Sequence, residues 1–413
     1  MILLYNALLL FMRAGIQLAA LFSSKAKAFV SGRKNVFREL EQKLHPPHPR
    51  VVWIHCASLG EFEQGRPVIE AVKKEFPETF ILLTFFSPSG YEIRKKYEQA
   101  NHVCYLPWDT HQNAERFISI AKPMLAIFVK YEFWHHYSLA LKSKNIPILS
   151  ISSIFRAGQL FFKSYGTFYR NILKNFSYFF VQNEVSLQLL QSINLKNSVL
   201  AGDTRFDRVN QIVKQGEEIP IAKIFKGDQK VFVVGSCWSE DLEVLIPMIN
   251  ENKLKFILAP HELSESFLSE IEKSLEVSSI RYSQADGKNL VDYQVLIIDN
   301  IGMLSRLYRY GEFAFIGGAF GKGLHNILEA ACYGVPIFFG DKNYEKFQEA
   351  TDLINRGGAF EVHDFSDLKS KYEMLNTPES FLLACEVTRQ YVEVNLGATE
   401  KIMTYIRKLF KTS

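Results

Sequence analysis

The chain has 413 residues, well beyond the roughly 250–300 residues at which a single hydrophobic core stops growing, so we expect two domains. Hydrophobic residues make up 47% and charged residues 22%, which is typical of a globular protein. A net charge of +4 is too small to indicate nucleic-acid binding, and five scattered cysteines without a CxxC pair argue against a disulfide framework or a zinc site.

The first 22 residues are almost wholly apolar, with Arg13 as their only charge, and a basic stretch follows them. A spanning helix needs roughly 20 apolar residues, and an arginine at mid-bilayer is costly. The segment also lacks the basic start of a signal peptide. We therefore interpret residues 1–44 as an apolar anchor, either spanning or interfacial, with a basic juxtamembrane segment that keeps the rest of the chain on the cytoplasmic side. A buried core helix is the alternative.

From about residue 50 the chain alternates between apolar runs and amphipathic segments. This alternation predicts βαβ units on a parallel sheet, which would make residues 45–210 a first α/β domain. The predicted strands are 51–54, 80–85, 103–106, 124–129, 147–151 and 178–181, and the predicted helices are 63–76, 90–99, 113–121 and 184–193.

A polar stretch at 211–229 interrupts the pattern and predicts an interdomain linker. The alternation then restarts, so we expect residues 211–413 to form a second doubly wound domain that ends in helices at 378–410. Its predicted strands are 230–235, 256–259, 295–298, 314–316 and 337–339, and its predicted helices are 240–251, 265–275 and 302–310.

The strand at 314–316 leads into a glycine-rich loop, and a helix is predicted to open near His325 or Asn326. Glycines let a backbone approach a ligand closely, and a helix N-terminus attracts anions. Glu329 would lie about one turn into this helix, where a carboxylate can reach the hydroxyls of a sugar. An ordinary strand-to-helix turn is the alternative.

The first predicted strand ends in a second small-residue loop, which opens a helix with Glu61 in its first turn. A helix N-terminus favours an ionised carboxylate, and a general base must be unprotonated to accept a proton. Glu61 is therefore a candidate general base. The alternative is that it only complements the helix dipole.

The segment His55-x-Ala57-Ser58-x-Gly60-Glu61-Phe62 resembles the opening motif of the 3-deoxy-D-manno-octulosonic acid (Kdo) transferases, which add Kdo to the lipid A precursor. An apolar N-terminal anchor also belongs to this family. The resemblance continues in order along nearly the whole chain, through Thr84, Ser87–Gly90, Tyr105–Asp109, Glu132–Trp134, Gln182–Glu184, Gly202–Asp207, Asp299–Gly302, Gly317–Glu329 and Gly334–Pro336.

The resemblance implies a GT-B fold, in which two Rossmann-like doubly wound domains face a cleft. It implies an inverting glycosyltransferase that moves Kdo from CMP-Kdo to lipid IVA in lipopolysaccharide core biosynthesis. The first domain would bind the acceptor and the second the donor. No metal or other cofactor is expected. The expected partners are CMP-Kdo, the lipid A precursor and lipids of the inner membrane, with the catalytic domains on its cytoplasmic face.

The family roles carry over onto matching positions of this chain. Glu61 takes the role of catalytic base, with Ser58 and Gly60 flanking the reacting sugar. Arginine binds carboxylates and phosphates through paired hydrogen bonds, so Arg156 and Arg205 are candidates for the Kdo carboxylate or lipid phosphates, unless they form surface ion pairs. Glu132 joins them on the acceptor side. The expected donor-binding residues are His261, Gly302, Gly321, Lys322, Gly323, Asn326 and Glu329.

The chain departs from the family pattern at three places. Pro260-His261 lacks the arginine that usually separates this pair, so one donor phosphate contact is either missing or supplied by Lys322. Lys130 stands where the family has the first acid of E-x-E, and Met303 stands in the acid position after D-T-x-G. The adjacent His135 and His136 should point apart, so we expect packing and surface roles rather than a metal site.

Two other functions remain open at this point. One is another GT-B enzyme that uses a UDP-sugar, either a transferase or an epimerase. The other is a catalytically inactive sugar-nucleotide sensor on the membrane.

Overall fold

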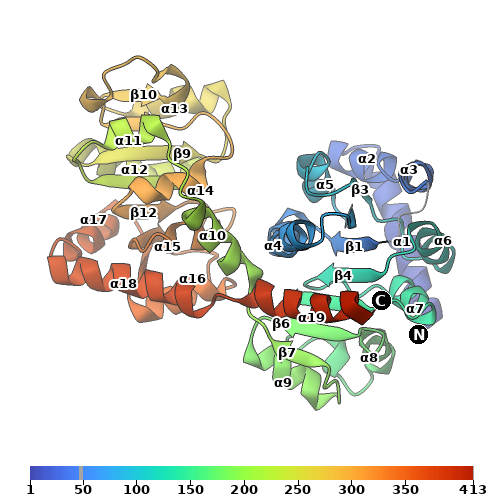
Figure 1. The fold of residues 1–413 in the computed structure, drawn as a ribbon. Helices are drawn as coiled ribbons and strands as arrows, with labels where there is room; N and C mark the ends of the chain where they lie inside the picture. The colour runs from blue at the N-terminus through green and yellow to red at the C-terminus, as the bar shows by residue number, and fades with distance from the viewer. Residues whose placement is uncertain (46–49, 413) are drawn as a thin grey trace. The chain divides into compact units, whose positions relative to one another are not determined.

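The computed structural model describes residues 1–45 and 50–412 and divides into two compact units. Unit 1 comprises Met1–Asp207 together with Leu396–Ser413, and unit 2 comprises Arg208–Asn395. Each unit is built on a seven-stranded parallel sheet covered by helices (Figure 1). This confirms the predicted α/β class with two doubly wound halves.

The sheet of unit 1 has the strand order β3-β2-β1-β4-β5-β6-β7, so the order reverses between β1 and β4. Its inner strands β1, β2, β4 and β5 are buried along their whole length, because helices cover both faces. The strands are β1 (Val51–Cys56), β2 (Phe80–Phe85), β3 (His102–Tyr105), β4 (Leu125–Val129), β5 (Ile148–Ser153), β6 (Tyr178–Val181) and β7 (Ser198–Leu200).

Alternate side chains of β1 enter two separate cores. Val51 and Trp53 pack on one face, and Val52, Ile54 and Cys56 pack on the other, as the two-residue period of a strand requires. The helices of this unit are α1 (Ile2–Ala19), α2 (Ser24–Ser31), α3 (Val36–Lys43), α4 (Leu59–Glu75), α5 (Pro88–Arg94), α6 (His111–Ala121), α7 (His135–Ser143), α8 (Thr167–Leu173), α9 (Glu184–Ser192), the start of α10 (Thr204–Gln215) and α19 (Ala398–Thr412).

The last helix, α19, belongs to unit 1 (Figure 1). Its apolar stripe Ile402, Ile406 and Phe410 lies in the same core as Ile54. The carboxylate of Asp207 accepts hydrogen bonds from two backbone N–H groups where α19 begins, at 2.7 and 2.6 Å. The assignment of residues 211–413 to the second domain is therefore wrong for this helix, because its apolar face completes the core of the first.

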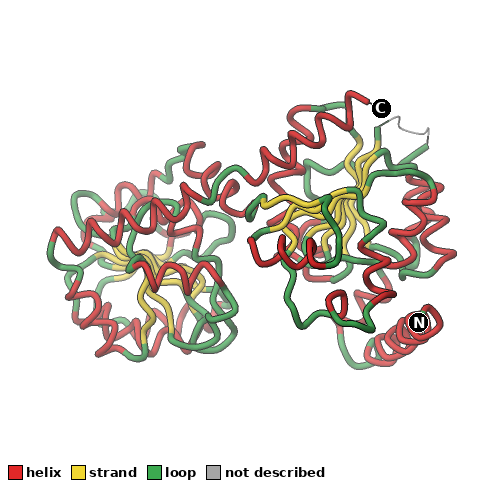
Figure 2. The backbone as a smooth tube through the Cα atoms, turned by 90° about the horizontal axis from the view of Figure 1, so that it is seen from below, coloured by secondary structure: helices red, strands yellow, loops and turns green. Residues whose placement is uncertain are grey.

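The sheet of unit 2 has the order β10-β11-β9-β8-β12-β13-β14 and reverses between β8 and β12. Within each unit, the strands lie together with helices around them (Figure 2). Its strands are β8 (Val231–Cys237), β9 (Lys255–Pro260), β10 (Ser279–Arg281), β11 (Val295–Ile297), β12 (Phe313–Ile316), β13 (Ile337–Gly340) and β14 (Ala359–Val362). Its helices are α11 (Pro220–Lys226), α12 (Ser239–Glu251), α13 (Glu265–Ser274), α14 (Leu304–Leu307), α15 (Leu328–Ala331), α16 (Gln348–Arg356), α17 (Phe365–Met374) and α18 (Pro378–Val394).

The predicted linker at 211–229 is wrong as a description of the backbone. Helix α10 runs through Gln215, and α11 covers half of the remainder. Ala222 and Phe225 are fully buried, and Ile219 is nearly so. This short apolar stripe packs α11 against unit 2. It was not predicted from the sequence because polar residues surround it there.

Helix α1 packs through one narrow stripe, in which only Leu9 is fully buried. Leu3, Leu8 and Phe11 on its other sides are 81%, 64% and 74% exposed. By length and composition alone, α1 is a helix that could cross a membrane.

Candidate functional site

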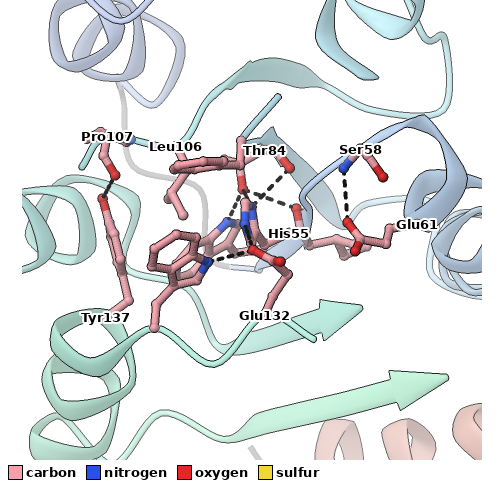
Figure 3. Close-up of polar contacts among 12 residues, drawn as sticks. His55, Ser58, Glu61, Thr84, Leu106, Pro107, Glu132 and Tyr137 are labelled. Carbon is pink, nitrogen blue, oxygen red and sulfur yellow. Dashed lines mark hydrogen bonds and ion pairs between the residues drawn. The ribbon is translucent and has the colours of Figure 1, made fainter. Parts of the chain in front are cut away.

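A buried hydrogen-bond network lies at the carboxyl ends of β1, β2 and β4, where the strand order of unit 1 reverses (Figure 3). In open α/β sheets this is the place where ligands bind. His55, at the end of β1, is fully buried. Its Nδ1 lies 2.8 Å from Oγ1 of Thr84, and its Nε2 lies 2.9 Å from Oε2 of Glu132. The indole of Trp134 donates to the same Glu132 oxygen at 2.7 Å.

The Thr84 hydroxyl oxygen accepts a hydrogen bond from the Trp53 indole at 2.8 Å and lies 2.8 Å from His55 Nδ1. A carboxylate accepts hydrogen bonds and does not donate them, so Nε2 of His55 carries a proton and donates it to Glu132. Two side chains, His55 and Trp134, thus hold the Glu132 carboxylate, which is only 9% exposed.

Glu61 stands in the first turn of α4, and its Oε2 accepts a hydrogen bond from the N–H of Ser58 at 3.0 Å (Figure 3). Burial, followed by the nearby Glu132 carboxylate, raises the pKa of Glu61 to about 7, against the lowering effect of the backbone N–H groups and Lys130. The helix N-terminus acts in the predicted direction, but burial outweighs it. Glu61 therefore titrates near neutrality, where a general base works best.

A cationic group, Lys130, lies near this carboxylate. Lys130 follows β4 with a φ of 66°, an uncommon value for a residue with a side chain. Its charge lowers the pKa values of Glu61 and Asp203, so it lies near both. Although burial alone would raise the pKa of Asp203, the guanidinium of Arg205 at 2.8 Å brings it below its usual range.

The other acceptor-side candidates are more exposed. Gly60 lies at the surface in the first turn of α4. Arg156 is exposed after β5, with its guanidinium carbon 5.8 Å from the ring centroid of Tyr131, next to Lys130. Arg205 forms an ion pair with the buried Asp203 carboxylate at 2.8 Å.

The glycine loop of unit 2 follows β12, at the reversal point of the second sheet. The buried Asp241 carboxylate accepts hydrogen bonds from the N–H groups of Gly318 and Trp238, both at 2.8 Å. A Cβ on Gly317 would collide with the backbone of β8, and Gly318 has a φ of 94°. Glycine is therefore required at both positions for the loop to close onto the start of α12.

Two histidines and a tryptophan stack beside this loop. The rings of Trp238 and His261 lie 4.1 Å apart, and those of His261 and His325 lie 4.7 Å apart. The Trp238 indole donates to Nε2 of His325 at 3.1 Å, which places the proton of His325 on Nδ1. Burial, followed by the neighbouring His261, lowers the pKa of His325 to about 4, so it is neutral at pH 7. The ammonium of Lys322 lies 5.7 Å from the Trp238 ring.

The helix expected near His325 or Asn326 begins later. The segment up to Asn326 is a loop, and α15 covers only Leu328–Ala331. The reason is local, since the N–H groups of Gly323 and His325 bond back to carbonyls of the glycine loop. A helix N-terminus is therefore not the anion site that the sequence predicted.

The remaining donor-side candidates surround this loop unevenly. The Asn326 amide donates to Oε1 of Glu329 at 3.1 Å. Gly321 is exposed, and Gly323 has a φ of 111° with the Lys346 ammonium close by. Gly302 lies in the exposed turn between β11 and α14.

Sequence reasoning missed three residues beside the glycine loop, Trp238, His325 and Asp241. A signal for Trp238 was available, because it directly follows a strand and precedes a helix, as the loop before Glu61 does.

A family model described as 3-deoxy-D-manno-octulosonic-acid transferase matches residues 32–208. A transferase of that name from Rickettsia felis is 28% identical over 373 residues, covering 87% of this chain and 79% of the relative. Another from Aquifex aeolicus is 26% identical over 366 residues, covering 87% of this chain and 94% of the relative.

The chain resembles Kdo transferases over most of its length. These matches identify it as an enzyme of the glycosyltransferase class, as the motifs predicted. UDP-GlcNAc 2-epimerase from Neisseria meningitidis has a similar structure, with a TM-score of 0.61 over 87% of this chain and 100% of the epimerase at 15% identity. That likeness concerns the fold. In residues 1–45 and 50–412 of this chain, no three His, Cys, Asp or Glu side chains are grouped as metal ligands would be.

Proposed function

We propose that the protein transfers Kdo from CMP-Kdo to the lipid A precursor lipid IVA, with inversion, in lipopolysaccharide biosynthesis. It would act at the cytoplasmic face of the inner membrane without a metal. The observation that supports this most is the environment of Glu61. This carboxylate is held by the Ser58 N–H, and burial raises its pKa to about 7.

In this mechanism the unprotonated Glu61 accepts the proton of the attacking acceptor hydroxyl. The hydroxyl oxygen forms the new bond to the anomeric carbon of Kdo as the bond to the CMP phosphate breaks. Ser58 and Gly60 flank the reacting sugar. Arg156 and Arg205 serve the anionic groups of Kdo or of the acceptor, since both can form paired hydrogen bonds with carboxylates and phosphates.

The leaving CMP carries the departing electron pair on its phosphate, which needs donors or positive charge. Unit 2 has both a hydrogen-bond donor and a positive charge beside its glycine loop. Lys322 is exposed beside Trp238, and neutral His325 has its N–H on Nδ1. Gly321 and Gly323 keep the loop backbone accessible. Asn326 and Glu329, bonded to each other, would contact the sugar hydroxyls of the donor.

The deciding experiment is mass spectrometry of tetra-acyl lipid A precursor after incubation with the purified full-length protein, CMP-Kdo and EDTA. A mass gain of one or more Kdo units is expected. A gain only with added magnesium would overturn the metal-free mechanism. A parallel incubation replaces CMP-Kdo with a UDP-sugar. A mass gain with the UDP-sugar alone, or no mass gain with either donor, would overturn the proposed donor.

The role of Glu61 is tested separately with Glu61→Gln. General-base catalysis contributes about 10²–10⁴-fold, so we expect kcat to fall by that factor while CMP-Kdo binding is kept. Glu63→Gln is the matched control, because Glu63 pairs with Arg94 at 2.9 Å instead of facing Ser58. Full turnover in Glu61→Gln would remove Glu61 as the base.

A further inference from the structure

Two adjoining cavities lie in unit 1 between α1, α2 and the chain segment that follows β3. The first has a volume of about 310 Å³ and is walled by Leu9, Leu10 and Trp108. The second has a volume of about 380 Å³ and is lined by Arg13, Lys34 and Trp108 among others. Arg13 and Trp108 border both cavities. Volumes of about 300–1,000 Å³ are usual for sites that hold small molecules.

The wall formed by α1 is held in place by polar contacts near its start. The Tyr5 hydroxyl donates to the buried Asp109 carboxylate at 2.5 Å, and the Asn6 side-chain oxygen lies 2.8 Å from Nε2 of His136. Asp109 also accepts the N–H groups of the first residues of α7. Helix α1 is thus docked along unit 1, and the cavity beside Leu9 is a defined space.

The charge around the second cavity has one sign. Among the described residues that line the two cavities, none is acidic, and Arg13, Arg33 and Lys34 are basic. The Arg33 guanidinium is used internally, because it donates to the carbonyls of Phe29, Phe86 and Leu106 at 2.6–2.9 Å. Arg33 therefore fixes the turn that presents Lys34, while Arg13 and Lys34 are exposed and can meet an anion.

We propose that these cavities bind one anionic glycerophospholipid of the bilayer. Arg13 and Lys34 hold its phosphate, and one acyl chain lies against Leu9, Leu10 and Trp108. The apolar outer side of α1, where Leu3 and Phe11 are 81% and 74% exposed, brings the mouth of the site to lipid. A cavity of about 310 Å³ is near the small end of the usual range, which argues against the tetra-acyl acceptor as its occupant.

A series of aromatic contacts connects the proposed lipid site to the hydrogen-bond network around Glu132. Trp108 lies 6.0 Å from the ring of Phe86, and Phe86 lies 5.0 Å from Trp134, whose indole donates to Glu132. A bound lipid would therefore pack on the outer end of a chain of rings that supports this carboxylate. This inference does not depend on the identity of the donor or of the general base.

The test is native mass spectrometry of the full-length protein released from detergent micelles with phosphatidylglycerol or phosphatidylcholine. We expect one retained phosphatidylglycerol and at least fivefold less phosphatidylcholine. Arg13→Gln/Lys34→Gln should lower phosphatidylglycerol retention at least fivefold. Lys25→Gln/Lys27→Gln removes the same charge from α2, outside both cavities, and should leave retention unchanged.

Leu10→Trp provides an independent variant, because it fills the first cavity from an exposed position and keeps the charges. It should also lose the lipid, with unchanged circular dichroism. Equal retention in wild type, Arg13→Gln/Lys34→Gln and Leu10→Trp would overturn the proposal. Displacement of phosphatidylglycerol by an equimolar amount of tetra-acyl precursor would also overturn it and assign the site to the acceptor.

Discussion

The Glu132 carboxylate lies close enough to Glu61 to make Glu61 harder to ionise. Glu132 accepts hydrogen bonds from two side chains, His55 and Trp134, whereas Glu61 has the Ser58 N–H and the influence of Lys130. Burial, followed by the neighbouring carboxylate, thus raises the pKa of Glu61 to about 7. Burial and charged neighbours are how enzymes obtain a carboxylate base that works at pH 7.

This arrangement predicts the pH dependence of kcat/KM. Because the base must be unprotonated, activity should rise with pH around a midpoint near 7, the pKa of Glu61. In Glu132→Gln the neighbouring negative charge is gone, so the pKa of Glu61 should fall and the midpoint should move to lower pH. The measurement is kcat/KM from pH 5 to 9 for both proteins.

Glu63→Gln serves as the control, because it removes a charge from the same helix that pairs with Arg94. Its midpoint should match that of wild type. A midpoint that stays fixed or rises in Glu132→Gln would contradict the coupling between the two carboxylates.

At the residue scale, the sequence made Glu61 a candidate because its signal is local, a carboxylate in the first turn after a small-residue loop. The family motif made Glu132 a candidate on the acceptor side. It could not reveal that Thr84 links Trp53 to His55, or that Asp241 ties the glycine loop to α12. These contacts join residues far apart in the chain, and no spacing rule predicts them.

Among the elements, α1 links the protein to its surroundings. Its docked stripe contacts unit 1, and its exposed leucines and Phe11 have no such partner. We expect deletion of residues 1–22 to move the protein from the membrane fraction to the supernatant after a high-salt wash. Tyr5→Phe, which loses the hydroxyl's hydrogen bonds with Asp109 and with the His135 N–H, should remain with the membranes. Sedimentation of the deletion variant with the membranes would assign attachment to another surface.

A substitution in the C-terminal helix α19 should destabilise unit 1, although most of unit 1 lies far from α19 in the sequence. Ile406 is fully buried in the core of unit 1. Ile406→Ala should lower the free energy of unfolding of unit 1 by about 2–5 kcal/mol, the usual cost of such a cavity. Thermal unfolding with limited proteolysis identifies the unit that melts. Thr404→Ala on the exposed side of the helix is the control, and equal loss of stability in unit 2 would contradict the assignment of α19.

The elements that the sequence predicted best are the inner strands, such as β2 and β6, whose apolar runs match their observed bounds. The strands β7, β10 and β14 were not predicted. They have three or four residues each and lie at or near the sheet edges, where partial exposure removes the continuous apolar run. Helix α15 was predicted too long because the backbone hydrogen bonds of the glycine loop compete with its first turn.

For the whole molecule, two separate sheets imply two unfolding transitions. A ligand stabilises the unit that binds it, by about 2.7 kcal/mol at a hundredfold excess over its Kd. We expect CMP to raise the midpoint temperature at which unit 2 (residues 208–395) unfolds. The unfolding transition of unit 1, which Ile406→Ala shifts, should stay unchanged. Calorimetry with CMP and with UDP measures this. A larger shift with UDP would favour a UDP-sugar enzyme.

The return of α19 to unit 1 also affects how the protein is made. Unit 2 is an insertion within unit 1, so residues 208–395 are synthesised before the last piece of the first core exists. At about 5–20 residues per second, this interval lasts roughly 10–40 s. During that time the apolar surface that Ile402 and Ile406 later cover stays open, and at its end the inserted unit has its complete sequence. The second unit in the chain is therefore the first that can finish folding on the ribosome, and the open surface of unit 1 is an expected binding site for chaperones.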